Sequence, residues 1–467
     1  MTRALYWFRN DLRLQDNPAF TEAVLRSERL SFVFIHDPRL WHKTPAGIPR
    51  MGWHRRKFLK QSLDDLRQQL ADFGFELLEI WGEPEFLIPE LMEDNAIDVL
   101  YFSSECGPEE RKIEISLKES LEICGREVVQ RWSQFLLEPG LLPFPLHSIS
   151  PVFTQFRKQI EGEGIDGLIP DEMQIGRNDV KARSLSLNWV HTFSLTGVQR
   201  ILSLQKKDWE QTWWQPSEPE LHLLNQLRIG SFPNDKSKII LGGTAAAERR
   251  IQEYFFETKA VLNYFETRNG LLSASDSTLF SSWLALGCVS ARQIYRQLKK
   301  CQDAYGANKS TYWVVFELLW REFFKLHLLH SGEDFFDSHV DENMVLDGDV
   351  KAAIDGLKIS DVLACRTGQN FIDANLRELI LTGFMSNRGR QNVASYLIHT
   401  LGICWKKGAS IFESLLIDYD VASNWGNWSY IAGARFDPRG GRRFNLEKQQ
   451  CEYDPLGQYV VSWSEQN

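Results

Sequence analysis

Several common signatures are missing from the sequence. Only seven of its 467 residues are cysteines, and they are scattered without a single Cys-x-x-Cys pair. This argues against a disulfide framework or a zinc site, and it predicts reduced thiols in a cytosol-like compartment. The ten histidines include no His-Glu-x-x-His motif, so a metal-dependent hydrolase has no support. We expect no bound metal.

Long apolar runs are also missing. No segment reaches the about 20 residues that a membrane-spanning helix needs, and no signal peptide precedes the first apolar run, Leu5–Phe8. These absences predict a cytoplasmic protein without membrane contact. The net charge of −9 argues against attraction of nucleic acid to the whole surface. A local basic groove stays open, and one cluster could line it: Arg435, Arg439, Arg442 and Arg443.

Aromatic residues are abundant, and 16 of them are tryptophans. Such an interior suits either stacking on a ligand or simply large cores. Hydrophobic residues make up 43% of the chain and charged residues 25%, which is typical of a soluble globular protein. The length of 467 residues allows two or three domains.

The N-terminal part alternates strand-like and helix-like patterns. The expected strands are Ala4–Phe8, Ser31–His36, Glu76–Trp81, Val99–Ser103 and Glu127–Trp132. The helical patterns between them are Pro18–Arg29, Trp53–Gly74, Pro84–Glu93 and Pro108–Cys124. Single helices between strands predict a parallel, doubly wound sheet. The first turn, Arg9–Leu14, lacks the Gly-x-Gly-x-x-Gly motif of dinucleotide sites, so this domain is not expected to be a standard NAD or FAD binder.

The periodicity weakens between about Ser133 and Lys238, where proline and glycine recur. This composition predicts a long connector with short helices. Beyond it the pattern is helical, without strand alternation. We therefore predict an α/β domain over residues 1–132, a connector over 133–240 and an all-helical domain over 241–467.

Polar residues interrupt runs that are otherwise core-like in the last third of the chain. Such groups are rarely buried unless they are paired. Arg390 and Asp418 form a natural ion pair, which leaves Asp420, Asn387 and Asn424 to face something polar. Two interpretations are equally open at this point: a satisfied polar network in a helical core, and a ligand pocket.

Two long runs in this region carry a specific signature. They are Thr382-Gly-Phe-Met-Ser-Asn-Arg-Gly-Arg-Gln-Asn-Val-Ala-Ser395 and Ile417-Asp-Tyr-Asp-Val-Ala-Ser-Asn-Trp-Gly-Asn-Trp428. They resemble the flavin-binding core of the photolyase and cryptochrome family, and in particular its DASH cryptochrome branch. The resemblance covers nearly the whole chain. It implies a photolyase-type α/β domain, a connector and a helical FAD-binding domain.

The opening run Trp7-Phe-Arg-Asn-Asp-Leu-Arg13 also matches this family. In the family, the α/β domain can hold a light-harvesting antenna, often a folate such as 5,10-methenyltetrahydrofolate. The resemblance places Glu105 near the region that contributes an antenna contact. An exposed loop carboxylate is an equally good interpretation of Glu105.

A hydroxyl-rich turn opens onto a helical pattern after Asp276. Ser277, Thr278 and Ser281 are good helix N-cap residues, and a helix N-terminus suits a pyrophosphate. Plain capping is the alternative. The resemblance implies that this turn and Tyr264 contact FAD. The complete set of implied cofactor contacts is Tyr264, Ser277, Thr278, Leu279, Phe280, Ser281, Arg321, Asn387, Arg390, Asp418, Tyr419, Asp420 and Asn424.

Glu317, Trp320, Arg321 and Phe324 recur at helical spacing and therefore share one face. A tryptophan beside a carboxylate and an arginine can stack on a base and bond its edge. An amphipathic helix with a salt bridge is the alternative. By resemblance, a lesion pocket is lined by Glu317, Trp320, Gln391 and Tyr430. The resemblance also implies that Arg268 contacts a DNA phosphate.

The resemblance also implies residues for electron transfer. Asn424 matches the residue that faces flavin N5, while Trp428 and Trp405 match the inner and middle members of a chain of three tryptophans. The third position holds Val362 in the run Val362–Gly368. Either an aromatic residue elsewhere ends the chain, or photoreduction is slow. Dimer repair itself needs only reduced flavin.

Three functions follow from the resemblance. The favoured one is a monomeric DASH-type flavoprotein that repairs cyclobutane pyrimidine dimers in single-stranded DNA under blue light. The second is a blue-light photoreceptor that signals through its flavin without repair. The third is a light-independent nucleic-acid-binding protein that keeps its flavin for structure. The chain ends soon after Trp463, without a long signalling tail, and this favours repair.

Overall fold

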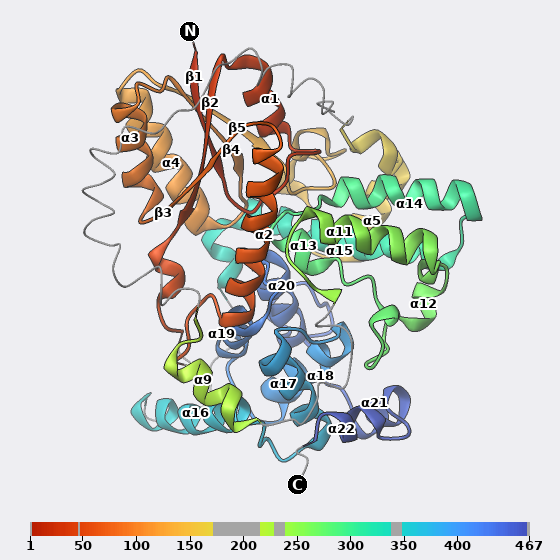
Figure 1. The fold of residues 1–467 in the computed structure, drawn as a ribbon. Coiled ribbons are helices and arrows are strands. Elements are labelled where there is room, and N and C mark those ends of the chain that lie inside the picture. The colour runs from red at the N-terminus through yellow and green to blue at the C-terminus, as the bar shows by residue number, and fades with distance from the viewer. Residues whose placement is uncertain (1, 45–46, 171–214, 228–238, 338–347, 465–467) are drawn as a thin grey trace.

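The computed structural model describes residues 2–44, 47–170, 215–227, 239–337 and 348–464. A parallel sheet lies at the N-terminal side and a large helical body lies beneath and beside it (Figure 1). Two stretches of the predicted connector, 171–214 and 228–238, lie outside the described residues.

The sheet has five strands in the order β3-β2-β1-β4-β5, and every neighbouring pair is parallel. The strands are β1 Arg3–Phe8, β2 Arg29–His36, β3 Leu77–Trp81, β4 Val99–Ser104 and β5 Glu127–Trp132. All five predicted strands are therefore confirmed, with ends that shift by two residues or fewer. The helices between them are α1 Pro18–Arg26, α2 Trp53–Ala71, α3 Pro84–Asp94 and α4 Pro108–Ile123. The doubly wound sheet that the alternation predicts is present.

Both faces of the sheet are buried, because side chains alternate along each strand. Along β1, Leu5 and Trp7 join a core with α3 and α4. Tyr6 and Phe8 point to the other face and join a larger core with α1, α2 and the helical body. One hydrophobic core therefore continues from the sheet into the helices.

The remaining elements are helical. The short helix η1 Pro38–Trp41 follows β2. The chain between the sheet and the helical body contains η2 Pro139–Leu141, η3 Leu146–Ser148, α5 Phe153–Glu163, η4 Ile165–Leu168 and α9 Glu218–Gln226. The helical body contains α11 Thr244–Ile251, η5 Gln252–Glu257, η6 Ala260–Asn263, α12 Tyr264–Thr267, η7 Ala274–Asp276, α13 Ser281–Ala285, α14 Ala291–Tyr305, α15 Lys309–Ser331, η8 Gly332–Phe336, α16 Gly348–Leu363, α17 Asn370–Thr382, α18 Asn387–His399, α19 Trp405–Leu415, α20 Val421–Ala432, α21 Leu446–Tyr453 and α22 Gln458–Ser462. Among the described residues of this region every element is a helix, as predicted.

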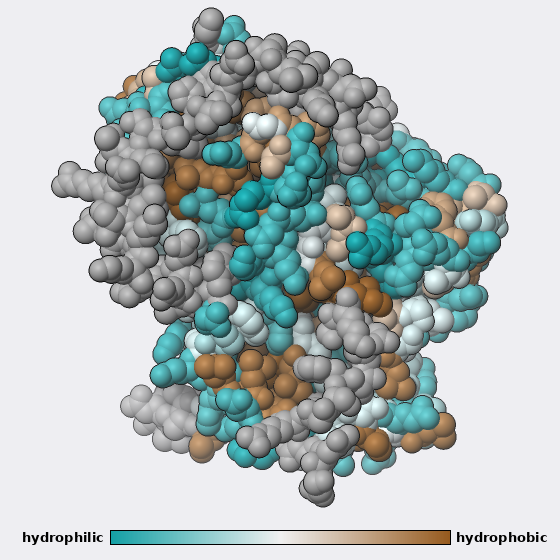
Figure 2. Space-filling view, in the orientation of Figure 1, coloured by the Kyte–Doolittle hydropathy of each residue, from teal (hydrophilic) through white to brown (hydrophobic). Residues whose placement is uncertain are grey.

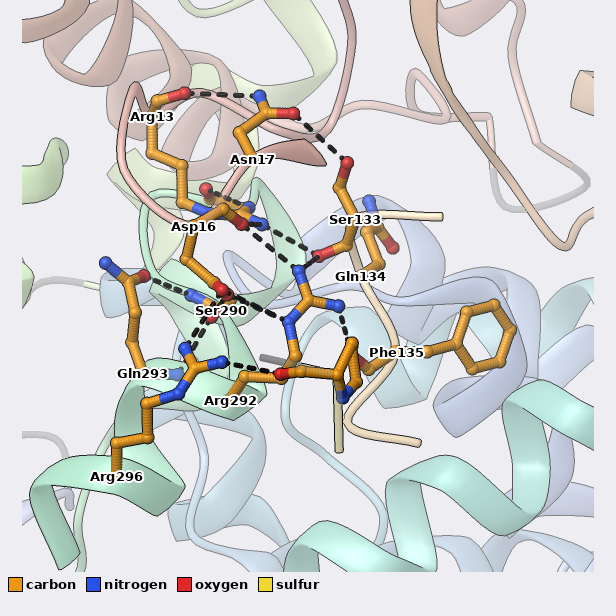
Figure 3. A network of polar contacts seen from close by, with 12 residues as sticks. Arg13, Asp16, Asn17, Ser133, Gln134, Phe135, Ser290, Arg292, Gln293 and Arg296 are labelled. Atoms are coloured by element: carbon orange, nitrogen blue, oxygen red, sulfur yellow. Dashed lines mark hydrogen bonds and ion pairs between the residues drawn. The ribbon is translucent and has the colours of Figure 1, made fainter. Parts of the chain in front are cut away.

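A buried polar network ties the sheet to helix α14 (Figure 3). The Asp16 carboxylate accepts hydrogen bonds from Arg292 at 3.0 Å and from Arg296 at 2.9 Å. Burial alone would raise the pKa of Asp16, but the neighbouring guanidinium groups hold that pKa below its ordinary value. Arg13 donates to the carbonyl of Ser133 at 2.7 Å, and Arg292 donates to the carbonyl of Phe135 at 3.0 Å.

The segment after β5 reaches helix α15 as well. Arg321 donates to the carbonyl of Gln134 at 2.7 Å, and the Leu137 amide donates to Glu322 at 3.1 Å. The long helix α15 is thus fixed against the sheet domain. This matters because α15 also forms one wall of the candidate site.

Figure 2 shows a largely hydrophilic surface along α2 and a hydrophobic patch lower on the same face, in the region of α17. Within the described ranges, no helix combines the length and the apolar character that crossing a membrane requires. Across the same residues, no group of three or more His, Cys, Asp or Glu side chains gathers in a way that could hold a metal ion.

Candidate functional site

Three adjoining cavities lie in the helical body, and all three are lined by Asn387 and Ser423. We call them the turn cavity, of about 240 Å³, the tryptophan cavity, of about 80 Å³, and the arginine cavity, of about 380 Å³. Their shared lining makes them parts of one hollow region. The arginine cavity lies within the about 300–1,000 Å³ typical of small-molecule sites, and the turn cavity is close to it.

The predicted cofactor residues line this hollow region. Eleven line the turn cavity: Tyr264, Ser277, Thr278, Leu279, Phe280, Ser281, Arg321, Asn387, Arg390, Asp418 and Asp420. The remaining two, Tyr419 and Asn424, line the tryptophan cavity. Helices α12, α13, α15, α18 and α20 bring together positions that are far apart in the sequence. Of the two interpretations that the polar residues allowed, the geometry favours a pocket.

The local structure of the turn differs from the expectation. Helix α13 begins at Ser281, and its N-cap residue is Phe280, which makes no side-chain capping bond. The alternative of plain capping by Ser277, Thr278 or Ser281 is therefore wrong for this helix. Leu279 adopts a positive φ of 62° and Phe280 already has helical backbone angles, so the chain turns sharply just before the helix.

Arg250 holds this turn in place. Its buried guanidinium donates to three main-chain carbonyls, those of Ala274 at 2.7 Å, Ser277 at 2.8 Å and Thr278 at 3.1 Å. An arginine can satisfy several carbonyls at once because it presents five donors in a fixed plane. Sequence reasoning missed Arg250, since its position on α11 gives no hint of the turn that it supports.

Asp418 and Asp420 line both the turn cavity and the tryptophan cavity, and each forms an ion pair. Arg390 donates to Asp418 at 2.8 Å, so the predicted pair is confirmed. The second carboxylate oxygen of Asp418, Oδ1, is buried and has no hydrogen-bond partner within the described part of the chain. A buried acceptor left without a donor is costly. The Asp418 oxygen is therefore available to a donor on a ligand.

Asp420 is paired with Lys325, a residue that sequence reasoning missed. The Lys325 ammonium lies 2.7 Å from Asp420 Oδ2 and is almost completely buried. The other Asp420 oxygen accepts from the Ser423 amide at 2.8 Å and so caps helix α20. Burial would raise the pKa of Asp420, but Lys325 and Arg321 outweigh it and lower that pKa. Asp420 is thus a fixed negative charge in the cavity wall.

The arginine cavity contains the residues expected to contact DNA. Its lining includes Arg268, Glu317, Trp320, Gln391 and Tyr430, together with Arg388 and Arg442. The five positions to which the resemblance assigns DNA contacts thus line one cavity, and their role in DNA binding stays a prediction. The predicted spacing of Glu317, Trp320, Arg321 and Phe324 on one helix face is also confirmed, since all four line this cavity from α15.

Two contacts orient the side chains of this cavity. Trp320 stacks on Phe153, with ring centroids 3.8 Å apart and an interplanar angle of 10°. Glu317 accepts from Arg268 at 2.8 Å and from the indole nitrogen of Trp313 at 3.1 Å. Burial raises the pKa of Glu317. The indole of Trp320 is held rigidly beside a carboxylate, an arrangement suited to a flat, hydrogen-bonding group.

The predicted electron-transfer residues occupy different surroundings. Trp428 is buried, lines the tryptophan cavity and meets the edge of Phe412 at 5.0 Å between ring centroids. Trp405 is buried and lines none of the three cavities, and its ring lies 5.8 Å from that of Trp425. Val362 is completely buried in α16. Asn424 donates through its side-chain amide to the Ala409 carbonyl at 3.0 Å.

Glu105 lies at the end of β4 and is buried, so the interpretation as an exposed loop carboxylate is wrong. Its carboxylate accepts from the Gln134 side chain at 3.2 Å. Burial raises the pKa of Glu105 to about 7, against the attraction of Arg9 and Lys325. The tertiary fold, which packs α15 against this loop, decides that burial.

The chain matches known proteins over nearly its whole length. Two family models match, DNA photolyase over residues 4–172 and the FAD binding domain of DNA photolyase over residues 313–466. Cryptochrome DASH of Gloeobacter violaceus is 38% identical over 461 residues, which cover 98% of this chain and 85% of that protein. Cryptochrome DASH of Danio rerio is 40% identical over 468 residues, which cover 97% of this chain and 81% of that protein.

Solved structures agree with this relationship. The crystal structure of the Synechocystis sp. cryptochrome is 36% identical, with a TM-score of 0.83, and the match covers 99% of this chain and 88% of that chain. A bacterial class III photolyase from Agrobacterium tumefaciens, at 24% identity and a TM-score of 0.75, shares the fold. The sequence motifs, the sheet, the helical cavity and these relatives lead to one conclusion. The chain belongs to the DASH cryptochrome branch of the flavin-dependent photolyase and cryptochrome family.

Proposed function

We propose that this protein repairs cyclobutane pyrimidine dimers under blue light, with FAD in the helical cavity and a preference for single-stranded DNA. The observation that carries the proposal is the arginine cavity, which combines an indole, a carboxylate and arginines beside the turn cavity. A dimer must leave the base stack to enter such a cavity, and extrusion costs least from a strand that is already unpaired.

The lining of the turn and tryptophan cavities fits FAD. The unpartnered Oδ1 of Asp418 offers an acceptor to a ribityl hydroxyl or a ring N–H, and Arg321 and Arg390 offer positive charge to a pyrophosphate. When bound, FAD in its reduced form would supply a light-driven one-electron donor. We assign its binding to the thirteen residues named above, with Asn424 on the flavin side.

The residues of this chain would act on DNA by position and charge. Trp320 offers a face on which a base can stack, and Glu317 and Gln391 offer hydrogen bonds to base edges. Tyr430 meets Trp320 edge to face at 5.6 Å and would close the opposite wall. Arg268 would bind a phosphate. Stacking of this kind is worth about 1–3 kcal/mol per base.

Repair by chemically reduced protein is the test. The substrate is an oligonucleotide with one thymine dimer, in single-stranded and double-stranded form, under blue light and in the dark. Light-dependent turnover on the single strand supports the proposal. No turnover with flavin bound and reduced would refute repair and favour the photoreceptor function. A Glu317→Ala variant is expected to keep its flavin and lose most repair, since its dimer contact is gone.

The other expectations stay predictions. They are the domain limits 1–132, 133–240 and 241–467, a monomeric state, a cytoplasmic location and a folate antenna. The burial of Glu105 beside Gln134 supports a structured environment at the predicted antenna region. Reconstitution with 5,10-methenyltetrahydrofolate, read by its absorption band, would test the antenna in the parent protein and in Glu105→Gln.

A further inference from the structure

The boundary between the turn cavity and the arginine cavity is formed by an ion pair. Arg268 and Glu317 each line both cavities, and Arg268 Nη1 lies 2.8 Å from Glu317 Oε1. The guanidinium also lies over the ring of Trp313, 5.0 Å from its centroid. Glu317 therefore already binds one of the cations that could bind a phosphate in this cavity.

Arg388, which lines the same cavity, differs from Arg268 in its contacts. Arg388 contacts neutral groups, the side chains of Asn269 at 3.0 Å and Gln449 at 3.4 Å and the ring of Tyr453. None of these contacts is an ion pair, although the charge of Glu452 acts on Arg388 at longer range, so Arg388 can bind a phosphate without giving up a carboxylate hydrogen bond. The charge of Arg268 is compensated by Glu317, although its Nε is buried and has no hydrogen-bond partner within the described residues.

Release of Arg268 is unfavourable unless Glu317 gains another donor. Without Arg268, the half-buried carboxylate would keep only the Trp313 indole as a partner, and a carboxylate with too few donors in such a position is destabilised. A pyrimidine that enters beside Glu317 brings N–H groups that can replace the guanidinium. A sugar-phosphate backbone alone brings none.

We propose that Glu317 is a specificity-determining counterion that keeps Arg268 from binding DNA phosphate until a base enters the cavity. The inference rests on the proposed function, because it takes DNA as the ligand of the arginine cavity. A strand without a base in the cavity meets one arginine fewer. When a strand inserts a dimer, Glu317 binds the base in place of Arg268. Arg268 then binds a phosphate in place of Glu317. The ion pair thus links phosphate binding to base binding.

The salt dependence of binding tests this coupling. Each phosphate contact on a single strand steepens the slope of log K against log salt by about 0.7. The probes are two single strands of equal length, one with a central thymine dimer and one with abasic residues at the same position. Binding to the FAD-loaded protein is measured by fluorescence anisotropy over a range of KCl concentrations.

The parent protein is expected to bind the dimer strand with a slope steeper by about 0.7 than that for the abasic strand. In Glu317→Gln, the slope for the abasic strand should steepen by the same amount. Its affinity for that strand should rise about 2- to 5-fold, the range expected for loss of a half-exposed competing ion pair. The two slopes then become equal. Glutamine keeps the shape of the side chain and a hydrogen bond to Trp313.

Two further variants serve as controls. In an Arg268→Gln background, Glu317→Gln should leave the abasic slope unchanged, because the competing cation is gone. Arg388→Gln should flatten the slopes for both strands equally, with or without Glu317, since Arg388 has no carboxylate partner in this cavity. Both controls also remain informative if one substitution lowers protein yield.

An unchanged abasic slope in Glu317→Gln would overturn the counterion role. If the abasic slope is unchanged in Glu317→Gln and FAD dissociates more slowly from this variant, the counterion role is also overturned. Arg268 would then be assigned to a cofactor phosphate. A steeper slope in a protein that shows no preference for the dimer would keep the counterion role and overturn the proposed repair function. Lack of DNA binding by parent and variants would overturn both.

Discussion

The buried pair of Lys325 and Asp420 offers the sharpest test of how the cavity is built. Lys325 Nζ lies 2.7 Å from Asp420 Oδ2 and 2.9 Å from the side-chain oxygen of Gln134, and its side chain is 2% exposed. Lys325→Met keeps most of the side-chain volume and removes the charge. Asp420 would then be a carboxylate in the cavity wall without its closest cation.

Breaking one partner of a buried pair costs about 3–5 kcal/mol. For a helical body of this size, about 1 kcal/mol corresponds to about 2–4 °C in Tm, so we expect a loss of about 6–20 °C. The assay is differential scanning calorimetry with excess FAD. The pKa of Asp420 is lowered in the folded protein. Its contribution is therefore present above the unfolded value of about 3.9 and is lost as the pH falls below it.

Two comparisons separate the ion pair from other effects. Lys299→Met removes an exposed lysine that lies 3.7 Å from Asp166, and it should change stability by about 1 kcal/mol or less. Asp420→Asn keeps an N-cap side chain for α20, so the double variant with Lys325→Met should recover most of the loss. A shift for Lys325→Met as small as that for Lys299→Met would refute the reasoning. A double variant less stable than Lys325→Met would also refute it.

Three further outcomes are expected. Gly408→Ala would place a Cβ 2.2 Å from a ring carbon of Trp428, so we expect a loss of about 1–3 kcal/mol and altered tryptophan fluorescence; unchanged emission would contradict this contact. Trp428→Phe should block light-driven flavin reduction and leave repair by chemically reduced protein intact, which absorbance during illumination measures. Asp16→Asn should cost about 3–5 kcal/mol by leaving Arg292 underpaired. Because the pKa of Asp16 is lowered, the parent should lose this part of its stability as the pH falls below about 3.9. The variant has no carboxyl group at this position and should not show this loss.

The fold could be predicted from the sequence because its two signals, apolar strand runs and helical periodicity, are both local. Strands of five to eight residues with apolar runs alternate with helical patterns, and the protein has these five strands in one parallel sheet. The predicted pair of Arg390 and Asp418 forms for a related reason. Opposite charges in two core-like runs have few other ways to be buried.

Residue type is a poor guide to the turn before α13, because the backbone of this turn is not extended. Ser277, Thr278 and Ser281 are good capping residues by type, but the left-handed turn at Leu279 gives the N-cap position to Phe280. Side-chain type predicts a cap only when the chain enters the helix in an extended conformation. The sequence does not show that entry angle.

The sequence alone determined the fold class, the family and the set of residues that gather around the cavity, because long motifs and periodic patterns are properties of the chain itself. Only the tertiary structure decided which charges are compensated. Lys325 reaches Asp420, Glu317 reaches Arg268, and Gln134 reaches Glu105 across separations from 29 to 95 residues. Such pairings depend on how helices and strands pack, and the energy of a buried charge depends on its nearest partner.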